Sequence, residues 1–199
     1  MALESLQELY LEQLKDLHSA ESQIIDALPK MIEQTKHPEL RKAFQTHLSQ
    51  TKEQLRRLEQ IGQRAGQKLT GHTCKGMKGL LEEGEEIMKE RADSDVLDAA
   101  LIAAAQRVEH YEIAGYGCAR TYARLLGLDD DAKLLQTTLD EEGDTDHLLT
   151  DLAERVINDD ALTGERMVGR GVERDADRES RTPSSRSRTV SDRDVRESR

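Results

Sequence analysis

Apolar residues recur every three or four positions over long stretches of the sequence. This spacing places apolar side chains along one face of an α-helix, and that face is buried against other helices. Residues 2 to about 35 predict one long helix of this kind. A bend rather than a stop is expected at Pro29, because a helix proline removes one hydrogen bond. The apolar face comprises Leu3, Leu6, Tyr10, Leu14, Leu17, Ile24, Leu28 and Met31.

A second long helix is predicted to begin at Pro38, because proline fits the first turn of a helix and keeps the preceding His37 extended. The apolar pattern weakens near Gly62 and Gly66. Its apolar face comprises Leu40, Phe44, Leu48, Leu55, Leu58 and Ile61. A loop and a shorter helix over residues 76–91 are expected to follow.

The second half of the chain predicts two more long helices. Short polar residues at positions 93–95 favour a helix start, and the third helix runs to Leu126, where Gly127 ends it. The apolar face of the fourth helix comprises Leu134, Leu135, Leu139, Leu148, Leu149, Leu152 and Val156. Residues 1–158 therefore predict an all-α, antiparallel four-helix bundle, with an extra short helix in the crossover between helices two and three.

The composition supports this fold and limits the partners. With one Phe, four Tyr and no Trp, the chain is poor in the aromatic residues that favour strands. The net charge of −11 lies within residues 1–158, because ten Arg balance ten acidic residues in residues 159–199. An acidic body suits cations better than nucleic acid, since it repels phosphate. The Arg- and Ser-rich residues 159–199 lack apolar periodicity and predict a disordered tail.

The sequence also bears on the compartment. The two cysteines, Cys74 and Cys118, form no CxxC pair, which favours a reducing environment. The N-terminal residues show no secretion signal, and the chain has no run of about 18 apolar residues that could span a bilayer. A soluble, cytoplasmic protein without a membrane partner is therefore expected.

Acidic residues interrupt three of the four apolar faces near mid-length. Glu21 interrupts the face of the first helix, and Glu112 interrupts that of the third, with Glu109 beside it. Glu142 does the same in the fourth helix, with Glu141 beside it. In an antiparallel bundle, mid-length positions of all helices meet at one level, so these carboxylates are expected to converge.

Converging buried carboxylates need a compensating positive charge, because each costs several kcal/mol to bury alone. Lys and Arg are scarce on the inner faces, so a pair of divalent or trivalent metal ions is the simplest solution. Hard oxygen ligands favour iron or manganese, and one or two such ions are expected. The second helix offers no clear inward acid at this level, because Glu53 lies at the edge of its inner face. That inner face comprises His47, Gln50, Thr51 and Gln54. The ExxH spacing of ferritin-like sites is absent from the second and fourth helices.

Five stretches, in order over residues 3 to about 156, match a known family. They are LKDLHSAESQIIDALPKM, LRKAFQTHLSQTKEQLRRLEQI, CKGMKGLLEEGEE, DAALIAAAQRVEHYEIAGYGCARTYARLLG and LLQTTLDEEGDTDHLLTDLAE. These stretches resemble the YciE/YciF family of bacterial ferritin-like stress proteins. The resemblance implies a ferritin-like bundle with a dimetal-type centre, a link to stress responses and a dimeric assembly.

The resemblance also assigns residues. Glu21, Glu112 and Glu142 carry over as ligands, followed by Glu109 and Glu141. The chain departs from the family at Gln50, where such proteins have Glu in an HxxET pattern, which leaves one metal position weak or empty. Further departures are His18 and Ser19, where Tyr and Asp are usual.

The expected function is stress protection through metal-linked oxygen or peroxide chemistry. Glu21 and Glu112 would be terminal ligands, Glu142 or Glu141 a bridge, and His47 a ligand or an orienting donor. The residues leave open whether the site turns over as a weak metal-dependent peroxidase or oxidase. The alternative is a non-enzymatic, dimeric structural protein with a vestigial metal site. An RNA-binding role of the Arg/Ser-rich tail is a third interpretation, disfavoured by its interspersed acids.

Overall fold

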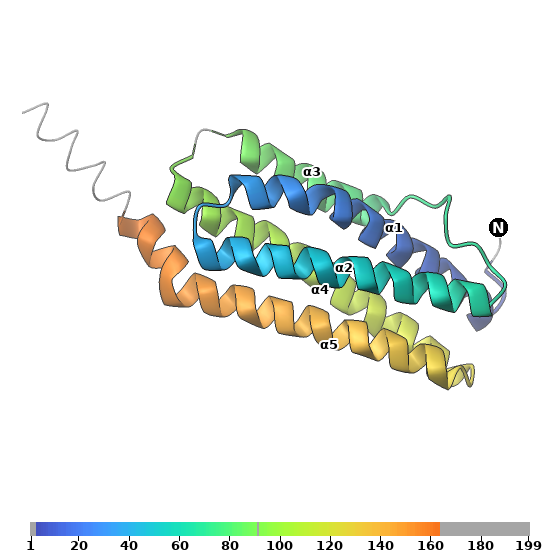
Figure 1. Ribbon diagram of the computed structural model, residues 1–199. Helices are drawn as coiled ribbons and strands as arrows, with labels where there is room; N and C mark the ends of the chain where they lie inside the picture. The colour runs from blue at the N-terminus through green and yellow to red at the C-terminus, as the bar shows by residue number, and fades with distance from the viewer. Residues whose placement is uncertain (1–2, 91, 164–199) are drawn as a thin grey trace, which may run out of the picture. The chain divides into compact units, whose positions relative to one another are not determined.

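The computed structural model describes residues 3–90 and 92–163, and this part of the chain contains five α-helices and one π-helical turn. The long helices are α1 (Leu6–Gln34), α2 (Pro38–Arg64), α4 (Ser94–Leu125) and α5 (Asp129–Leu152). The shorter α3 (Lys75–Lys89) lies in the connection between α2 and α4. Figure 1 shows the resulting bundle, which confirms the predicted all-α fold with a short helix in the crossover.

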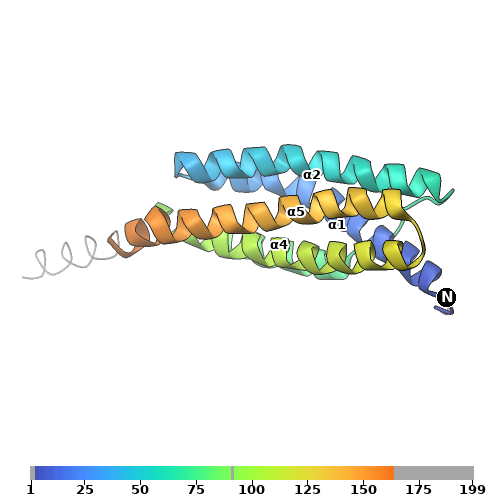
Figure 2. The same cartoon turned by 90° about the horizontal axis from the view of Figure 1, so that it is seen from below.

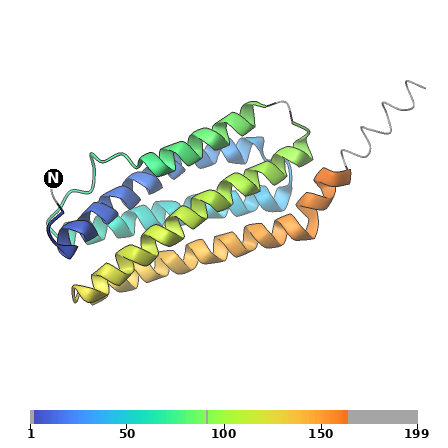
Figure 3. The same cartoon turned by 180° about the vertical axis from the view of Figure 1, so that it is seen from behind.

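The four long helices enclose one core in the order α1, α2, α5, α4. α1 contacts α2 and α4, while α5 contacts the same two helices from the opposite side (Figures 1 and 2). α3 covers the outer surface of α1 and α4 (Figure 3). None of the helices in the described ranges is long and apolar enough to cross a membrane.

The ends of α1 follow from its sequence. The Ser5 hydroxyl accepts a hydrogen bond from the backbone N–H of Glu8 at 3.2 Å, and the Glu8 carboxylate accepts the Ser5 N–H at 3.1 Å. This reciprocal capping box satisfies two backbone donors that a helix start leaves free. The helix continues through Pro29 to Gln34, so the proline does not stop it, as predicted.

A buried carboxylate fixes the turn between α1 and α2. Asp98 of α4 is 1 % exposed and accepts hydrogen bonds from the backbone N–H groups of Lys36 at 2.9 Å and His37 at 2.7 Å. His37 is extended, with φ −68° and ψ 126°, as expected of a residue before Pro38. Asp98 thereby ties the α1–α2 turn to α4.

The turn between α4 and α5 depends on Gly127. Its φ of 73° lies in the left-handed region, which a side chain would strain. This conformation lets the N–H of Leu128 donate to the carbonyl of Ala123 at 2.9 Å and close the end of α4. The predicted helix end at Gly127 is confirmed.

A small polar cluster anchors the start of α3. The buried thiol of Cys74 donates to Asp16 Oδ2 at 3.2 Å and lies 2.9 Å from the Tyr111 hydroxyl, which itself donates to Asp16 at 2.6 Å. The Cys74 N–H donates to the Ser19 hydroxyl at 2.9 Å. Burial raises the pKa of the Cys74 thiol, so this cysteine is held as a neutral structural group.

The chain remains helical beyond α5. A π-helical turn, η1 (Ala153–Ile157), follows Leu152, and residues 158–163 are helical as well. The predicted end of the bundle at residue 158 therefore falls within a continuing helical stretch. Residues 164–199, which make up most of the predicted disordered tail, lie outside the described residues.

The hydrophobic core is divided into two clusters along the bundle. The Phe44 cluster comprises Ala20, Ile24, Leu28, Met31, Leu40, Ala43, Phe44, Cys74, Met77, Leu101, Ile102, Ala105, Val108, Leu149, Leu152 and Ile157. The Tyr10 cluster comprises Tyr10, Leu14, Leu17, Leu58, Ile61, Leu69, Tyr116, Ala119, Ala123, Ala132 and Leu135. On α2, α4 and α5 the residues between these clusters are largely polar, which places a polar layer at the middle of the bundle.

Candidate metal centre

Every long helix contributes a buried polar side chain to the mid-bundle layer. The layer comprises Glu21 of α1, His47, Thr51 and Gln54 of α2, Glu109 and Glu112 of α4, and Thr138, Glu142 and Thr145 of α5. The four glutamates are at most 1 % exposed. Unpaired glutamate is rarely buried to this extent in proteins, so the layer needs a specific explanation.

Four of these side chains converge closely enough to share an ion. One ligand atom each from His47, Glu109, Glu112 and Glu142 lies within 4.8 Å of the other three. The four residues come from three helices, because α4 supplies both Glu109 and Glu112 one turn apart. His47 Nε2 lies 3.3 Å from Glu109 Oε1, without the geometry of a hydrogen bond.

Most of the polar atoms in this group have no hydrogen-bond partner. Within the described residues, the buried atoms without a partner include Glu21 Oε2, His47 Nδ1 and Nε2, Glu109 Oε2, Glu112 Oε1 and Oε2, and Glu142 Oε2. Leaving one such atom unpaired costs about 1–3 kcal/mol, and more for a charged group. The concentration of unpaired oxygen and nitrogen atoms at one point suits a positively charged partner such as a metal cation.

Glu21 lies beside this group and is held by a tyrosine. The hydroxyl of Tyr116, which is fully buried, donates a short hydrogen bond to Glu21 Oε1 from α4 to α1. Burial, followed by the charges of Glu21 and Glu112, raises the pKa of Tyr116 well above its ordinary value. Tyr116 therefore keeps its proton and orients one oxygen of Glu21.

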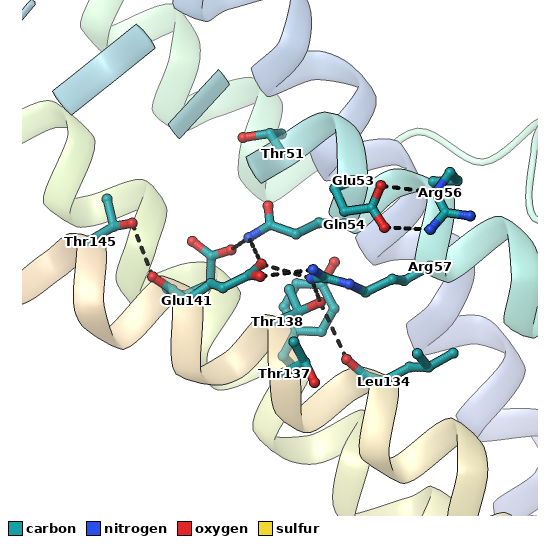
Figure 4. Close-up of polar contacts among 12 residues, drawn as sticks. Thr51, Glu53, Gln54, Arg56, Arg57, Leu134, Thr137, Thr138, Glu141 and Thr145 are labelled. Carbon is teal, nitrogen blue, oxygen red and sulfur yellow. Dashed lines mark hydrogen bonds and ion pairs between the residues drawn. The ribbon is translucent and has the colours of Figure 1, made fainter. Parts of the chain in front are cut away.

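On α2, the amide of Gln54 and the guanidinium of Arg57 face Glu141 of α5 (Figure 4). Gln54 Nε2 donates a short hydrogen bond to Glu142 Oε1 and a second one to Glu141 Oε2 at 3.1 Å. Arg57 binds both oxygens of Glu141, with nitrogen–oxygen distances of 2.7 and 2.8 Å. Arg57 also donates to the Thr138 hydroxyl at 3.1 Å.

The electrostatics of the metal-free layer resist full ionisation. Burial is the main cause that raises the pKa of Glu21, Glu109 and Glu112 well above the ordinary value, and the charges of neighbouring glutamates add to it. Burial also raises the pKa of Glu142 to about 7, while hydrogen bonds from Glu109 and Gln54 oppose the shift. A bound cation would offset the free-energy cost of ionising these buried carboxylates.

The pKa of His47 is shifted in the opposite direction, downward. Burial lowers the pKa of its imidazole to about 4, against the opposing charge of Glu141. The ring is therefore neutral near pH 7 and keeps a lone pair for coordination. A neutral imidazole among carboxylates is a donor set that iron and manganese accept.

The spacing of the four ligand atoms fits one such ion. Metal bonds to oxygen and nitrogen are roughly 2.1 Å long, so ligand atoms on opposite sides of an ion are about 4.2 Å apart. The observed limit of 4.8 Å allows this shell after a small inward movement of the side chains. The residues present therefore fit a transition-metal cation of the iron or manganese type.

The structure brings most of the predicted site residues together. His47, Glu109, Glu112 and Glu142 form the convergent group, and Glu21 is buried next to them. Glu141, which the sequence also predicted as a ligand, lies outside the group. Its carboxylate is 23 % exposed and paired with Arg57, because adjacent helix residues face different directions.

Gln50 does not belong to the layer either. It is half-buried and lines a surface groove between α2 and α5, together with Thr46, Thr145 and Leu148. The prediction placed it on the inner face of its helix next to His47. The buried positions of α2 at this level are instead His47, Thr51 and Gln54.

Sequence reasoning did not identify the roles of Tyr116 and Arg57. A tyrosine on an apolar helix face is typical of ordinary packing, and an arginine on a charged helix carries no pattern that marks it. The only pattern that points to Arg57 is its spacing of three residues from Gln54, which places both on one helix face.

Comparisons with known proteins agree with this architecture. The model of a family described as domain of unknown function DUF892 matches residues 5–162. Protein YciF of Escherichia coli strain K12 is 42 % identical over 159 residues, which cover 79 % of this chain and 96 % of YciF.

Solved structures support the same relationship. The crystal structure of the E. coli stress protein YciF matches with a TM-score of 0.75 and 42 % identity, covering 78 % of this chain and 99 % of the other. YcfI of Rhodopseudomonas palustris, described as a candidate structural protein, has a TM-score of 0.72 and 43 % identity over 74 % and 94 % of the two chains.

A third structure shows the fold alone. The protein XCC3681 of Xanthomonas campestris has a TM-score of 0.66 at 18 % identity, covering 81 % of this chain and 98 % of its own. The family match spans most of the described bundle, and the identity to YciF extends over nearly the whole of that relative. This chain therefore belongs to the DUF892 family of YciF-like stress proteins.

Proposed function

We propose that this protein is a cytoplasmic, ferritin-like stress protein that binds iron or manganese in the mid-bundle layer and uses it in oxygen or peroxide chemistry. The observation that carries the proposal is the convergence of His47, Glu109, Glu112 and Glu142 within 4.8 Å in a buried layer. The relative in E. coli is itself described as a stress protein, which supports the physiological context.

The donor set defines the class of cation. Carboxylate oxygens and a neutral imidazole suit iron and manganese, whereas copper(I) and iron–sulfur clusters require soft thiolate ligands. The thiol of Cys74 is engaged with Asp16 and Tyr111, and Cys118 is exposed, so neither cysteine belongs to the layer. When bound, an ion of this class supplies redox chemistry toward oxygen or peroxide.

The protein's own groups prepare the site for that ion. The Phe44 and Tyr10 clusters exclude water from both sides, which strengthens the electrostatic attraction between carboxylates and cation. Neutral His47 presents a lone pair, and Tyr116 holds a proton on its hydroxyl while it orients Glu21. Such hydrogen bonds to ligands fix their direction before the metal arrives.

Metal content tests the proposal. Protein purified without chelator and loaded with iron(II) or manganese(II) is expected to retain metal, as measured by mass spectrometry of the elements. Glu112→Ala is expected to lose it, because Glu112 has two oxygens without a partner in the layer. The matched control is Glu83→Ala, which removes an exposed glutamate of α3 and leaves the metal content unchanged. Equal metal content in wild type and Glu112→Ala would contradict the proposal.

A non-enzymatic structural protein with a vestigial metal site is the rival function. The description of the Rhodopseudomonas palustris relative as a candidate structural protein favours it. The difference from the family at Gln50 does not favour the structural function, because Gln50 lines a surface groove and does not belong to the mid-bundle layer. Survival of cells under peroxide separates the two functions. Our proposal expects Glu112→Ala to lose protection while Glu83→Ala keeps it, and the rival expects both variants to protect equally.

A homodimer is part of the same proposal, since the family resemblance implies it. Size-exclusion chromatography with light scattering measures the mass of the particle directly. A particle of one chain at micromolar concentration would contradict the dimer without affecting the metal site.

A further inference from the structure

We propose that the mid-bundle layer holds a single metal ion. The place where a second ion would bind is instead occupied by the hydrogen-bond donors of Gln54, Arg57 and Tyr116. This inference rests on the proposed function, because it concerns the number of ions in the same layer. It departs from the dimetal centre that the family resemblance implies.

The size of the convergent group is the first argument. In two-metal sites the ions are about 3.5–4 Å apart, so with bonds of roughly 2.1 Å the outermost ligand atoms are about 8 Å apart. One ligand atom from each of His47, Glu109, Glu112 and Glu142 lies within 4.8 Å of the other three. These four atoms fit the shell of one ion.

The individual carboxylate oxygen atoms of the layer differ in their hydrogen-bond partners. Glu142 Oε1 accepts the Gln54 amide, and Glu21 Oε1 accepts the Tyr116 hydroxyl. The second oxygen of each of these carboxylates has no partner, and neither does either oxygen of Glu112. Each of Glu21 and Glu142 therefore turns one oxygen toward a protein donor and leaves one for a cation.

The orientation of Gln54 follows from the same carboxylates. Its amide nitrogen faces Glu142 Oε1 and Glu141 Oε2, while its amide oxygen has no partner. A reversed amide would place an oxygen against two carboxylate oxygens, which repel it. The N–H donors of Gln54 thus point at the atoms that a second ion would need as ligands.

α2 supplies no replacement for those ligands. Its buried polar residues are His47, Thr51 and Gln54, and the Thr51 hydroxyl donates to the backbone carbonyl of His47 at 2.8 Å. Of the acidic residues on α2, Glu53 is bound to Arg56 on the outside, and Glu39 and Glu59 are exposed. A second ion would have no carboxylate on the α2 side of the layer.

The positive charge on that side is already present in the protein. Arg57 is half-buried, and its guanidinium binds Glu141 through both oxygens, so it neutralises the one carboxylate of α5 next to Glu142. A divalent ion placed there would have to displace or face this fixed cation. Charge repulsion and the missing ligand both act against a second position.

The first experiment counts the ions. The full chain, freed of metal by a chelator, is titrated with manganese(II) in a calorimeter, and the loaded protein is examined by electron paramagnetic resonance. One manganese per chain with the hyperfine pattern of an isolated ion is expected. Two ions per chain with the spectrum of a spin-coupled pair would overturn this inference and leave the proposed function intact. Failure to bind either manganese(II) or iron(II) would contradict both.

The second experiment attempts to create the second position. The double variant Gln54→Glu with Arg57→Met adds a carboxylate on α2 and frees Glu141, so two manganese ions per chain and a coupled spectrum are expected. The matched control is Gln50→Glu, which introduces the same charge one turn away in the surface groove and is expected to bind one ion. Circular dichroism verifies the helical content of each variant.

The outcomes of the variants are decisive in either direction. A folded double variant that still binds one ion would show that Gln54 and Arg57 do not block a second position. Two ions in Gln50→Glu would likewise overturn the assignment, because the missing ligand would then lie at position 50. If the double variant does not fold, the ion count of the wild type decides the inference alone.

Discussion

Arg57 of α2 binds the carboxylate of Glu141 of α5 through two parallel contacts, Nη1 to Oε2 at 2.7 Å and Nη2 to Oε1 at 2.8 Å. The next residue, Glu142, is fully buried and has no guanidinium partner; it accepts the neutral amide of Gln54. One residue along a helix corresponds to a rotation of about 100°. That rotation separates a carboxylate neutralised by the protein from one that is available to a cation.

The first prediction concerns this ion pair. Arg57→Met is expected to lower the free energy of unfolding by about 1–3 kcal/mol, because it leaves the half-buried Glu141 without its partner. Urea denaturation measures the change. The control Arg56→Met removes the exposed partner of Glu53 and is expected to change the stability little. Equal losses in the two variants would show that the Arg57–Glu141 pair has no special importance.

The second prediction is a pH dependence of the metal-free protein. The folded-state pKa values of Glu21, Glu109, Glu112 and Glu142 are raised, so the folded state binds more protons than the unfolded chain above about pH 4.3. This contribution to stability is full below that pH and is lost as the pH rises through about 7 for Glu142. For Glu142 alone the loss is roughly 3–4 kcal/mol.

His47 sets the acidic limit of the same profile. Its pKa is lowered to about 4, so folded His47 binds fewer protons than it does in the unfolded chain below about pH 6.5, and the contribution of His47 to stability falls as the pH falls through that range. Thermal melting in chelator is therefore expected to give the highest melting temperature at mildly acidic pH and a decline toward pH 8. Manganese should abolish the decline. A metal-free melting temperature that rises between pH 6 and pH 8 would contradict the burial of these carboxylates.

The third prediction separates stability from metal binding. Glu112→Gln replaces a buried, chargeable group by a neutral one of similar shape, so the metal-free protein at about pH 8 should gain roughly 1–3 kcal/mol. The same variant should lose the increase in melting temperature that manganese gives to the wild type. Differential scanning calorimetry with and without manganese measures both effects. A variant that is less stable without metal and still stabilised by it would refute the assignment of Glu112.

The fourth prediction compares two glycines of α4. A Cβ atom at Gly115 would lie 2.8 Å from Leu17 Cδ2 in the packed core, whereas a Cβ at Gly117 would meet nothing within 4 Å. Gly117→Ala should raise the free energy of unfolding by about 0.5–1 kcal/mol, because alanine favours helix. Gly115→Ala should lower it by roughly 1 kcal/mol, because overpacking costs about 1–3 kcal/mol. Equal effects of the two substitutions in urea denaturation would contradict the tight α1–α4 contact.

The long helices and three glutamates of the candidate site can be predicted from the spacing of residues within each helix. The periodic apolar residues predicted four long helices, and Glu21, Glu112 and Glu142 stood out because each replaces an apolar residue in such a pattern. All three are fully buried in the structure. A regular helix converts sequence spacing into direction, so this part of the prediction needed no knowledge of the packing.

The rest of the candidate site depends on contacts between helices that lie far apart in the sequence. Gln50 and Gln54 are both amides on α2, and only the rotation of that helix in the bundle decides which one faces Glu142. Glu141 was predicted beside Glu142 as a ligand, but its environment depends on Arg57, which lies 84 residues earlier in the chain. Asp98 was not identified either, because its partners are backbone N–H groups of the α1–α2 turn.

The Phe44 and Tyr10 clusters close the polar layer on either side, and they also control how a metal ion reaches it. His47, Glu109, Glu112 and Glu142 are at most 3 % exposed, so a cation reaches them only when neighbouring helices separate briefly. Such a separation of helices is a local opening of the fold, and it is rare in a packed bundle because it costs free energy. An ion loaded into the layer is therefore kinetically trapped, with a residence time set by the flexibility of the bundle rather than by affinity alone.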